Sequence, residues 1–317
     1  METALQLNLL ITVCLICWST WGLFDKKALE SAGHLDVLLF QHVYYALEVP
    51  IVLVILNCLF SKGWQISPEV WLWTGLGSGV SSSGALFYLV AMGRAEASFV
   101  LGITAAYPLL VQVLAHFFLN EALVNERMLG SVLVGLGVAL VGSSRQQEHP
   151  DHAIHEDDDH EKIAAKKKSA KEHHLGILLM CLLATLCWAL TGLFDKKAIN
   201  LDLPIKVYFA RCLWDVAFLF VMLAVYRQRR YQVAWNAGQA WKFAGLSSLC
   251  LSLGTLSYMF ALPMATASYL IVITGCYPLL MYLFAVLFLK ERLSKMRLLG
   301  VALVVAGGLM VQQTQGL

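Results

Sequence analysis

The sequence predicts an all-α integral membrane protein in which ten transmembrane helices form two inverted five-helix repeats. Hydrophobic residues make up 59% of the 317 residues and charged residues 14%, whereas soluble domains have roughly 45–50% and about 25%. One block also occurs twice, since residues 17–28 (CWSTWGLFDKKA) return as residues 187–198 (CWALTGLFDKKA). Each copy holds five apolar runs, and an odd number of spans makes the second copy enter the membrane in the opposite orientation.

The duplication keeps one register along the chain. An offset of 170 residues (187 minus 17) carries residues 107–110 to residues 277–280, both Tyr-Pro-Leu-Leu, and Glu121 to Glu291 without a gap. Chance does not preserve a register over such a length. Internal duplication in a hydrophobic chain is typical of secondary transporters.

The ten apolar runs are long enough to be transmembrane helices. A helical span needs about 20 apolar residues, whereas a membrane strand needs about 10 residues that alternate in polarity. The fourth and ninth runs contain Pro108 and Pro278, which predict a kink or a partly unwound segment beside a cavity. The runs are residues 5–24, 37–60, 70–92, 97–119 and 127–144 in the first copy, and 175–194, 204–226, 241–261, 265–289 and 297–313 in the second.

A polar linker separates the copies and divides the chain into residues 1–144, 145–174 and 175–317. The linker holds six of the nine histidines together with aspartate and lysine runs, and few large apolar residues. Such a composition cannot form a packed core, so we expect the linker to be disordered. It is either a solvated tether or a loop that senses a metal such as Zn²⁺ or Ni²⁺. The tether is the simpler interpretation, and no metal site is assigned.

Composition and motifs exclude several classes of function. A formal net charge of +2 is too small to indicate a nucleic-acid partner. The eight cysteines fall almost entirely within apolar runs, where we expect them to pack as small apolar side chains. The N-terminus lacks the features of a signal peptide, so residues 5–24 are expected to remain as the first span. Without an ATP-binding motif, transport would be coupled to an ion gradient, most simply of protons, or to exchange, and no cofactor is expected.

Short motifs near the helix ends resemble those of a known family. The pairs Asn120-Glu121 and Lys290-Glu291 close the fourth helix of each copy, and Leu129-Gly130 and Leu299-Gly300 open the fifth. Together with the two five-helix copies, they resemble the EamA family of the drug/metabolite transporter superfamily. The resemblance implies alternating access and a central cavity built from helices one to four and six to nine, with the fifth and tenth peripheral. Its members export amino acids, metabolites or drugs, and some relatives carry nucleotide sugars or sugar phosphates.

Ionisable residues inside apolar runs are costly, at least about 2.5–3.5 kcal/mol each at the bilayer centre, and therefore indicate function. The second run carries a polar face, and the seventh run carries Arg211 and Asp215 four residues apart, so that these two can pair. The offset of 170 equates the two polar faces, which we expect to meet across the pseudo-two-fold axis where inverted-repeat transporters bind substrate. The polar face of the second run consists of Gln41, Tyr44, Tyr45 and Glu48, of which the first three are equated with Arg211, Trp214 and Asp215.

These positions have a functional and a structural interpretation. In the functional one, Glu48 or Asp215 carries a proton and Arg211 meets an anionic group of the substrate. In the structural one, Arg211 and Asp215 form a buried pair and Glu48 bonds to tyrosine hydroxyls. Asp215 is expected to stay ionised beside Arg211, which makes Glu48 the better proton carrier. His116, near the end of the fourth run, either serves function or only reaches toward the interface.

Aromatic residues that recur in both copies suit the wall of a cavity that passes partly apolar cargo, although helix packing also explains them. The repeated Asp-Lys-Lys triplets at residues 25–27 and 195–197 are most simply anchors at helix ends. The predicted substrate-binding residues are Trp18, Gln41, Tyr44, Tyr45, Glu48, Tyr107, Trp188, Arg211, Trp214, Asp215 and Tyr277, with Glu48 and Asp215 as the proton-coupling pair.

The sequence therefore predicts a multi-pass transporter of the cell or inner membrane. Its expected partners are the lipid bilayer, a small-molecule substrate and protons; its oligomeric state stays open, and a monomer could work. A nucleotide-sugar or sugar-phosphate exchanger is one alternative, and an intramembrane enzyme using Glu48, His116 and Asp215 is another. Most lysines and arginines lie in the loops after odd-numbered helices, which favours a cytoplasmic location for those loops. The family resemblance implies the reverse orientation, with both termini in the cytoplasm.

Overall fold

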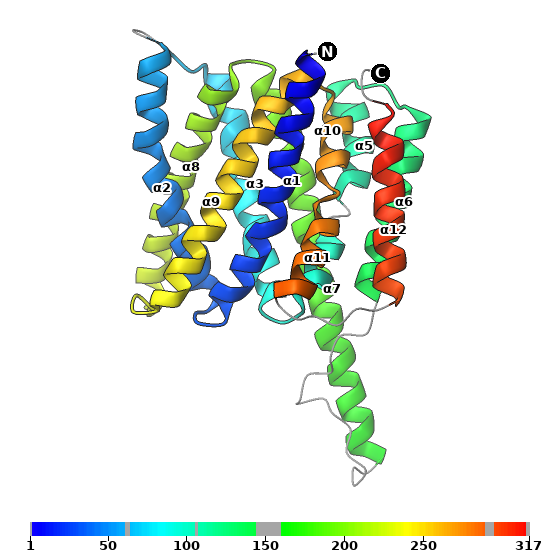
Figure 1. Ribbon diagram of the computed structural model, residues 1–317. Helices are drawn as coiled ribbons and strands as arrows, with labels where there is room; N and C mark the ends of the chain where they lie inside the picture. The colour runs from blue at the N-terminus through cyan, green and yellow to red at the C-terminus, as the bar shows by residue number, and fades with distance from the viewer. Residues whose placement is uncertain (1, 61–63, 105–106, 144–159, 289–294, 315–317) are drawn as a thin grey trace.

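The computed structural model describes residues 2–60, 64–104, 107–143, 160–288 and 295–314. Every regular element in these ranges is a helix, so the predicted all-α class is confirmed for the described residues (Figure 1). The elements are α1 (Glu2–Leu29), α2 (His34–Leu59), α3 (Pro68–Met92), α4 (Ala97–Thr104), α5 (Tyr107–Leu119), α6 (Asn125–Ser143), α7 (His160–Ile199), α8 (Pro204–Gln228), α9 (Gly238–Ala261), the 3₁₀ turn η2 (Leu262–Met264), α10 (Ala267–Thr274), α11 (Tyr277–Phe288) and α12 (Lys295–Gln312).

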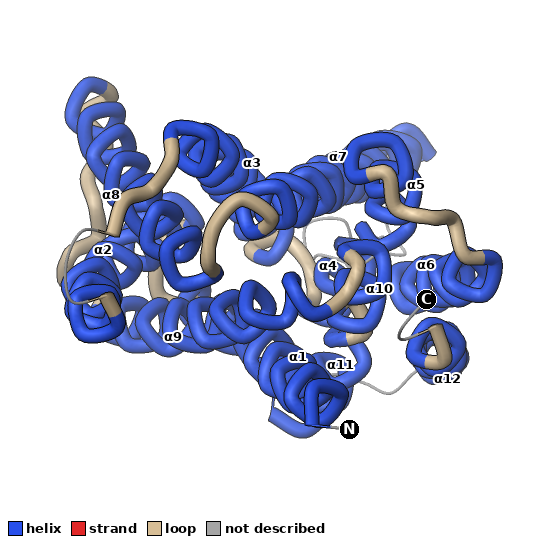
Figure 2. The backbone as a smooth tube through the Cα atoms, turned by 90° about the horizontal axis from the view of Figure 1, so that it is seen from above, coloured by secondary structure: helices blue, strands red, loops and turns tan. Residues whose placement is uncertain are grey.

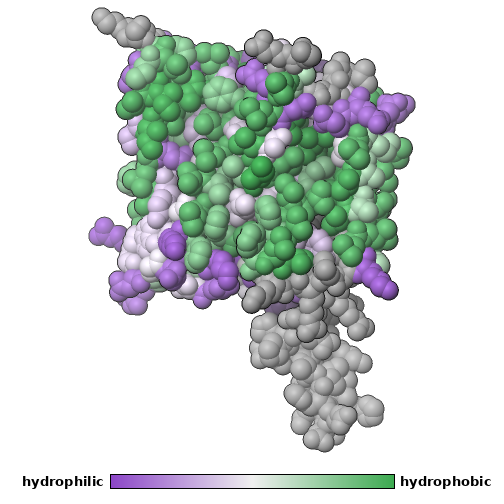
Figure 3. Space-filling model, viewed as in Figure 1, coloured by the Kyte–Doolittle hydropathy of each residue, from purple (hydrophilic) through white to green (hydrophobic). Residues whose placement is uncertain are grey.

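The outer surface is that of a multi-pass integral membrane protein. Seven helical segments in the described ranges are long and apolar enough to cross a membrane, and shorter apolar helices accompany them. Large apolar side chains point outward, for example Leu5 and Phe117, both 72% exposed, and Phe220, 65% exposed. Figure 3 shows them as a broad hydrophobic belt, with hydrophilic residues gathered toward its two margins. Exposing such an apolar surface to water would be unfavourable, whereas contact with lipid is not.

Helices of one copy pack against helices of the other copy, and equivalent helices make equivalent contacts. Helix α1 lies against α9 and α3 lies against α7, and the offset of 170 converts the first pair into the second. The equivalent helices α2 and α8 contact each other, as do α6 and α12 at the far end of the molecule (Figure 2). This arrangement places α1, α2, α3, α7, α8 and α9 around a common centre and leaves α6 and α12 at the periphery.

Glycines let α6 and α12 approach until their backbones touch. A Cβ atom built on Gly137 would lie 2.4 Å from the carbonyl oxygen of Gly300, and one built on Gly307 would lie 2.4 Å from that of Gly130. Gly130 of α6 therefore lies beside Gly307 of α12, and Gly137 lies beside Gly300. Residue numbers rise along one helix as they fall along the other, so the two helices run antiparallel. Small residues permit the same close approach in other membrane helix pairs.

Gly137→Ala is expected to separate α6 from α12, because the added methyl group meets backbone atoms that cannot rotate away. Overpacking of this kind costs about 1–3 kcal/mol, which should lower the thermal unfolding temperature of the purified protein in detergent. Gly176→Ala in α7 is the matched control, since a Cβ there meets nothing within 4 Å and alanine favours a helix by up to about 1 kcal/mol. Equal unfolding temperatures for the two variants would contradict this account of the interface.

The predicted interruption of the ninth apolar run is confirmed. Helix α10 ends at Thr274, and α11 begins at Tyr277 after a turn at Gly275 and Cys276. Pro278 falls in the first turn of α11, where its missing N–H costs no helical hydrogen bond. In the first copy α4 ends at Thr104 and α5 begins at Tyr107, and residues 105–106 between them lie outside the described residues.

Helix α7 begins earlier than expected, at His160, inside the segment assigned to the linker. Its first part projects from the bundle (Figure 1), and its membrane-compatible portion is Glu172–Ile199. The alanines and lysines of residues 163–171 are good helix formers, which explains the extension. Residues 144–159, with most of the His- and Asp-rich stretch, lie outside the described residues, so the tether and metal-sensing interpretations stay predictions.

Candidate functional site

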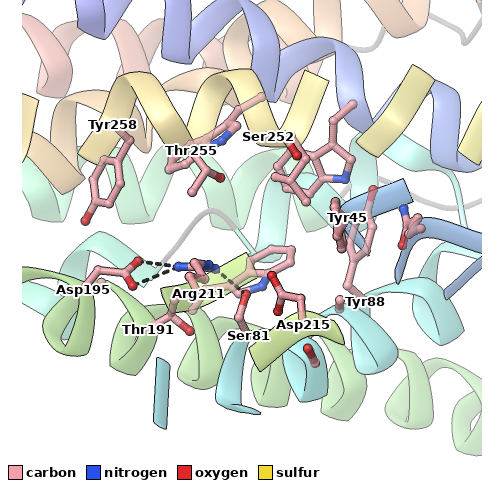
Figure 4. A pocket seen from close by; sticks show the side chains of 18 of the residues that line it. Tyr45, Ser81, Tyr88, Thr191, Asp195, Arg211, Asp215, Ser252, Thr255 and Tyr258 are labelled. Carbon is pink, nitrogen blue, oxygen red and sulfur yellow. Dashed lines mark hydrogen bonds and ion pairs between the residues drawn. The ribbon is translucent and has the colours of Figure 1, made fainter. Parts of the chain in front are cut away.

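A cavity of about 140 Å³ lies between the two copies near the centre of the bundle. Helices α1, α2, α3, α7, α8 and α9 contribute most of its wall, and α5, α10 and α11 supply single residues. Figure 4 shows polar side chains from several of these helices pointing into it. Among the predicted substrate-binding residues, those that line the cavity are Trp18, Gln41, Tyr45, Glu48, Tyr107, Trp188, Arg211, Asp215 and Tyr277.

Tyr44 and Trp214, which the offset equates, are not among the residues lining the cavity. The Tyr44 ring fills the space left by Gly245, where an added Cβ would lie 2.6 Å from the ring. Trp214 fills the equivalent space at Gly75, and its indole N–H donates to the carbonyl oxygen of Trp71 at 3.0 Å. Neighbouring residues on a helix point about 100° apart, so Tyr45 and Asp215 can face the cavity while Tyr44 and Trp214 pack against the helices beside them.

Arg211 pairs with Asp195, and not with Asp215 as its spacing on α8 suggested. One guanidinium nitrogen lies 2.9 and 2.7 Å from the two carboxylate oxygens of Asp195, and the other donates to the hydroxyl of Ser81 at 3.0 Å (Figure 4). Arg211 pairs with Asp195 in preference to Asp215 because its guanidinium lies at hydrogen-bonding distance from both carboxylate oxygens of Asp195, and such charge-assisted hydrogen bonds are strong. Asp215 lies close enough to interact with Arg211 electrostatically without forming an ion pair.

The first copy repeats this arrangement without a cation. Asp25 is equivalent to Asp195, and Gln41, equivalent to Arg211, donates to its carboxylate at 2.7 Å. The Trp21 indole N–H donates at 2.6 Å, and the Ser247 hydroxyl also donates. Three neutral donors therefore satisfy the buried Asp25 side chain.

Sequence reasoning missed Asp25 and Asp195, which it treated as part of helix-end anchors. Both are buried, at 1% and 2% exposure, because α1 and α7 continue one turn beyond them. The lysines that follow do act as anchors: Lys26 donates to the carbonyls of Met92 and Ala95, and Lys196 donates to those of Leu262 and Ala265, at 2.6–2.9 Å. The sequence did carry a signal for these two aspartates, because they occupy the same position in the block that occurs in both copies.

Glu48 is held by hydroxyl groups from the other copy. The Tyr208 hydroxyl of α8 donates to one carboxylate oxygen at 2.6 Å, and the Ser252 hydroxyl of α9 donates to the other. No cation is among these partners. The arrangement has the form expected under the structural interpretation, except that the tyrosine comes from α8 and not from α2.

Aromatic rings from both copies form the rest of the wall. Trp18 lies 5.5 Å from Tyr258 between ring centroids, and Trp21 lies 5.6 Å from Trp188. Among the described residues, the indole N–H of Trp18 and the hydroxyls of Tyr88, Tyr258 and Tyr277 are buried without a hydrogen-bond partner. Buried polar atoms normally have partners, so these groups are available to a ligand.

His116 lies apart from the cavity. Its Nδ1 is 3.0 Å from the carbonyl oxygen of Glu121, near the C-terminal end of α5. The Glu121 carboxylate in turn accepts the backbone N–H groups of Ala267 and Ser268, at 2.7 and 2.9 Å, and so caps the N-terminus of α10. The structure therefore does not assemble Glu48, His116 and Asp215, the three residues considered for an intramembrane enzyme.

Comparisons with known proteins point to one family. The sequence model of the EamA-like transporter family matches residues 6–143 and 174–312, one match for each copy. No curated protein matches the chain. Among solved structures, one crystal structure of a protein 16% identical in sequence aligns with a TM-score of 0.68 and covers 96% of this chain and 98% of that one. At this identity the likeness shows the fold alone.

Proposed function

Because the chain belongs to the EamA-like transporter family, we propose that it is a secondary transporter that moves a small metabolite or drug-like compound across the membrane by alternating access. In this proposal ten helices form two inverted repeats, and export is the direction that the family resemblance implies. One observation carries the proposal: equivalent residues of both copies, Asp25 with Gln41 and Asp195 with Arg211, converge on one central cavity. Inverted-repeat transporters bind substrate at such a position.

Alternating access needs contacts that can open on one side while equivalent ones close on the other. The cap that Glu121 places on α10 is a suitable contact, because it fastens the first copy to a short helix of the second. Arg127 reinforces it by donating to the hydroxyls of Thr266 and Ser268 at 2.9 and 2.6 Å. We propose that these contacts hold one side closed in the conformation described here.

Coupling to protons is supported by the partners of the cavity carboxyl groups. Among the described residues, Glu48 accepts hydrogen bonds from two hydroxyl groups, which can hydrogen-bond either a carboxylate or a carboxylic acid. Burial without a cation makes proton uptake the natural way to neutralise such a group. We therefore propose that Glu48 carries the proton, and that Asp215, beside Arg211, contributes to the same coupled site.

The proposal is tested by flux into liposomes that contain the purified protein. Amino acids, nucleotide sugars and organic cations are offered with and without a proton gradient, and protein-free liposomes are the control. We expect saturable uptake of at least one class, driven by the gradient and collapsed by a protonophore. If correctly folded, inserted protein moves none of these compounds under either condition, the transporter proposal is wrong.

A further inference from the structure

We propose that the substrate of the central cavity is an organic cation, an amine or quaternary ammonium compound whose apolar body is about the size of one aromatic ring. The inference rests on the proposed function, since it names the class of compound that the transporter carries. Three independent features of the cavity support it: its charge, its aromatic wall and its volume.

The cavity holds more negative than positive side chains. Carboxyl groups of Asp25, Glu48, Asp195 and Asp215 face it, whereas Arg211 is the single lysine or arginine among the described residues that line it. The Arg211 guanidinium is already committed to Asp195, at 2.7 and 2.9 Å. Carboxylates that are buried together without cations are strongly destabilising. Of the other three, Asp25 and Glu48 accept hydrogen bonds from neutral donors, and a carboxylate without such donors needs positive charge from a proton or from a ligand.

The contacts of His42 do not require it to carry that charge. His42 also lines the cavity, and its Nδ1 lies 2.9 Å from the carbonyl oxygen of Leu38 while its Nε2 lies 3.2 Å from the hydroxyl of Ser82. A carbonyl can only accept, so Nδ1 carries the hydrogen, and the serine hydroxyl can donate to Nε2. These partners satisfy a neutral imidazole.

Asp215 is the carboxyl group best placed to meet a cationic ligand. Asp25 accepts three hydrogen bonds from neutral donors and Glu48 accepts two. Asp215 has fewer partners among the described residues: the hydroxyl of Ser78 lies near its carboxylate, and no ion pair joins it to Arg211. Figure 4 shows Asp215 beside Arg211, whose dashed contacts run only to Asp195 and Ser81. Its carboxylate therefore has hydrogen-bonding capacity left for an ammonium group.

The aromatic wall suits the same class of ligand. Trp18 and Trp188 occupy equivalent positions in the two copies, and Tyr258 and Tyr277 lie against Trp18 at centroid distances of 5.5 and 6.2 Å. The faces of such rings attract cations, and more strongly when the pair is desolvated. The unpartnered tyrosine hydroxyls can also accept hydrogen bonds from an ammonium group.

The volume of the cavity sets the size of the ligand. At about 140 Å³, it is close to the roughly 150 Å³ of an engineered protein cavity that binds benzene. A nucleotide sugar is several times larger, and its diphosphate would add negative charge beside carboxylates that lack cations. Size and charge therefore both favour a small organic cation over an anionic exchanger substrate.

The test measures binding to the full-length protein in lipid nanodiscs, by calorimetry. The probes share one aromatic ring and differ in charge: benzyltrimethylammonium is a permanent cation, benzyl alcohol is neutral and phenylacetate is an anion. We expect the cation to bind at least about tenfold more tightly than the other two, equivalent to about 1.4 kcal/mol. Asp215→Asn should weaken cation binding by a similar factor, whereas Glu69→Gln, at an exposed position in α3, should not.

Equal or tighter binding of phenylacetate by the wild-type protein would overturn the inference without any variant having to fold. Wild-type cation affinity in a folded Asp215→Asn protein would overturn the role given to Asp215. Neither result touches the proposed transporter function, because that proposal is tested by flux and not by the charge of the ligand.

Discussion

Replacing Glu48 with glutamine is expected to abolish the pH dependence of transport while substrate still binds. Glutamine keeps the shape of the side chain and can still bond to Tyr208 and Ser252, the hydroxyl partners of Glu48, but it can neither take up nor release a proton. A transporter that depends on this proton would lose accumulation against a gradient and keep exchange of substrate across the membrane.

The measurement is substrate accumulation in proteoliposomes with and without an imposed proton gradient, with binding measured separately in nanodiscs. In the variant, the ratio of the two accumulation levels should fall to one, whereas the exposed control Glu69→Gln should keep the wild-type ratio. Binding affinity of the Glu48→Gln protein should no longer vary between mildly acidic and mildly alkaline pH. Proton-driven accumulation at the wild-type level in Glu48→Gln would remove Glu48 from the coupling mechanism.

Replacing Arg211 with glutamine is expected to destabilise the protein severely. Removing one partner of a buried ion pair costs about 3–5 kcal/mol, because the other charge stays behind uncompensated. The first copy tolerates glutamine at the equivalent position only because Trp21 and Ser247 also donate to Asp25. The residues equivalent to those donors are Thr191 and Gly77, so Asp195 has no comparable set of neutral donors.

Thermal unfolding in detergent, together with the yield of folded protein, measures this effect. The double variant Asp195→Asn with Arg211→Gln should recover most of the lost stability, since neither buried charge remains. Asp195→Asn alone should also be harmful, because it strands Arg211. Asp215→Asn, which removes the partner that helical spacing suggested for Arg211, should affect stability less and cation binding more. If Arg211→Gln unfolds at the wild-type temperature, the pair with Asp195 does not stabilise the fold.

Much of the candidate site could be predicted because each element carries its own local signal. Gln41, Tyr45 and Glu48 form one face of α2 by helical spacing, and the repeat register led from that face to Arg211 and Asp215. The cost of burying polar groups in lipid made these positions conspicuous in an otherwise apolar sequence. Tyr44 and Trp214 do not line the cavity, since spacing alone does not say which of two adjacent side chains faces a cavity and which fills the groove beside a glycine.

The sequence by itself determined the all-α class, the membrane location and the duplication, since hydropathy, length and register are properties of the chain read in order. Only the tertiary structure decided which charges pair. Asp195 and Arg211 are 16 residues apart and on different helices, and no periodicity relates their side chains. Their contact depends on how α7 and α8 approach one another, which is fixed by packing across the repeat interface. The packing of α9 against α1 brings Ser247 of the second copy to Asp25 of the first, and so decides that one buried aspartate needs a cation while its equivalent does not.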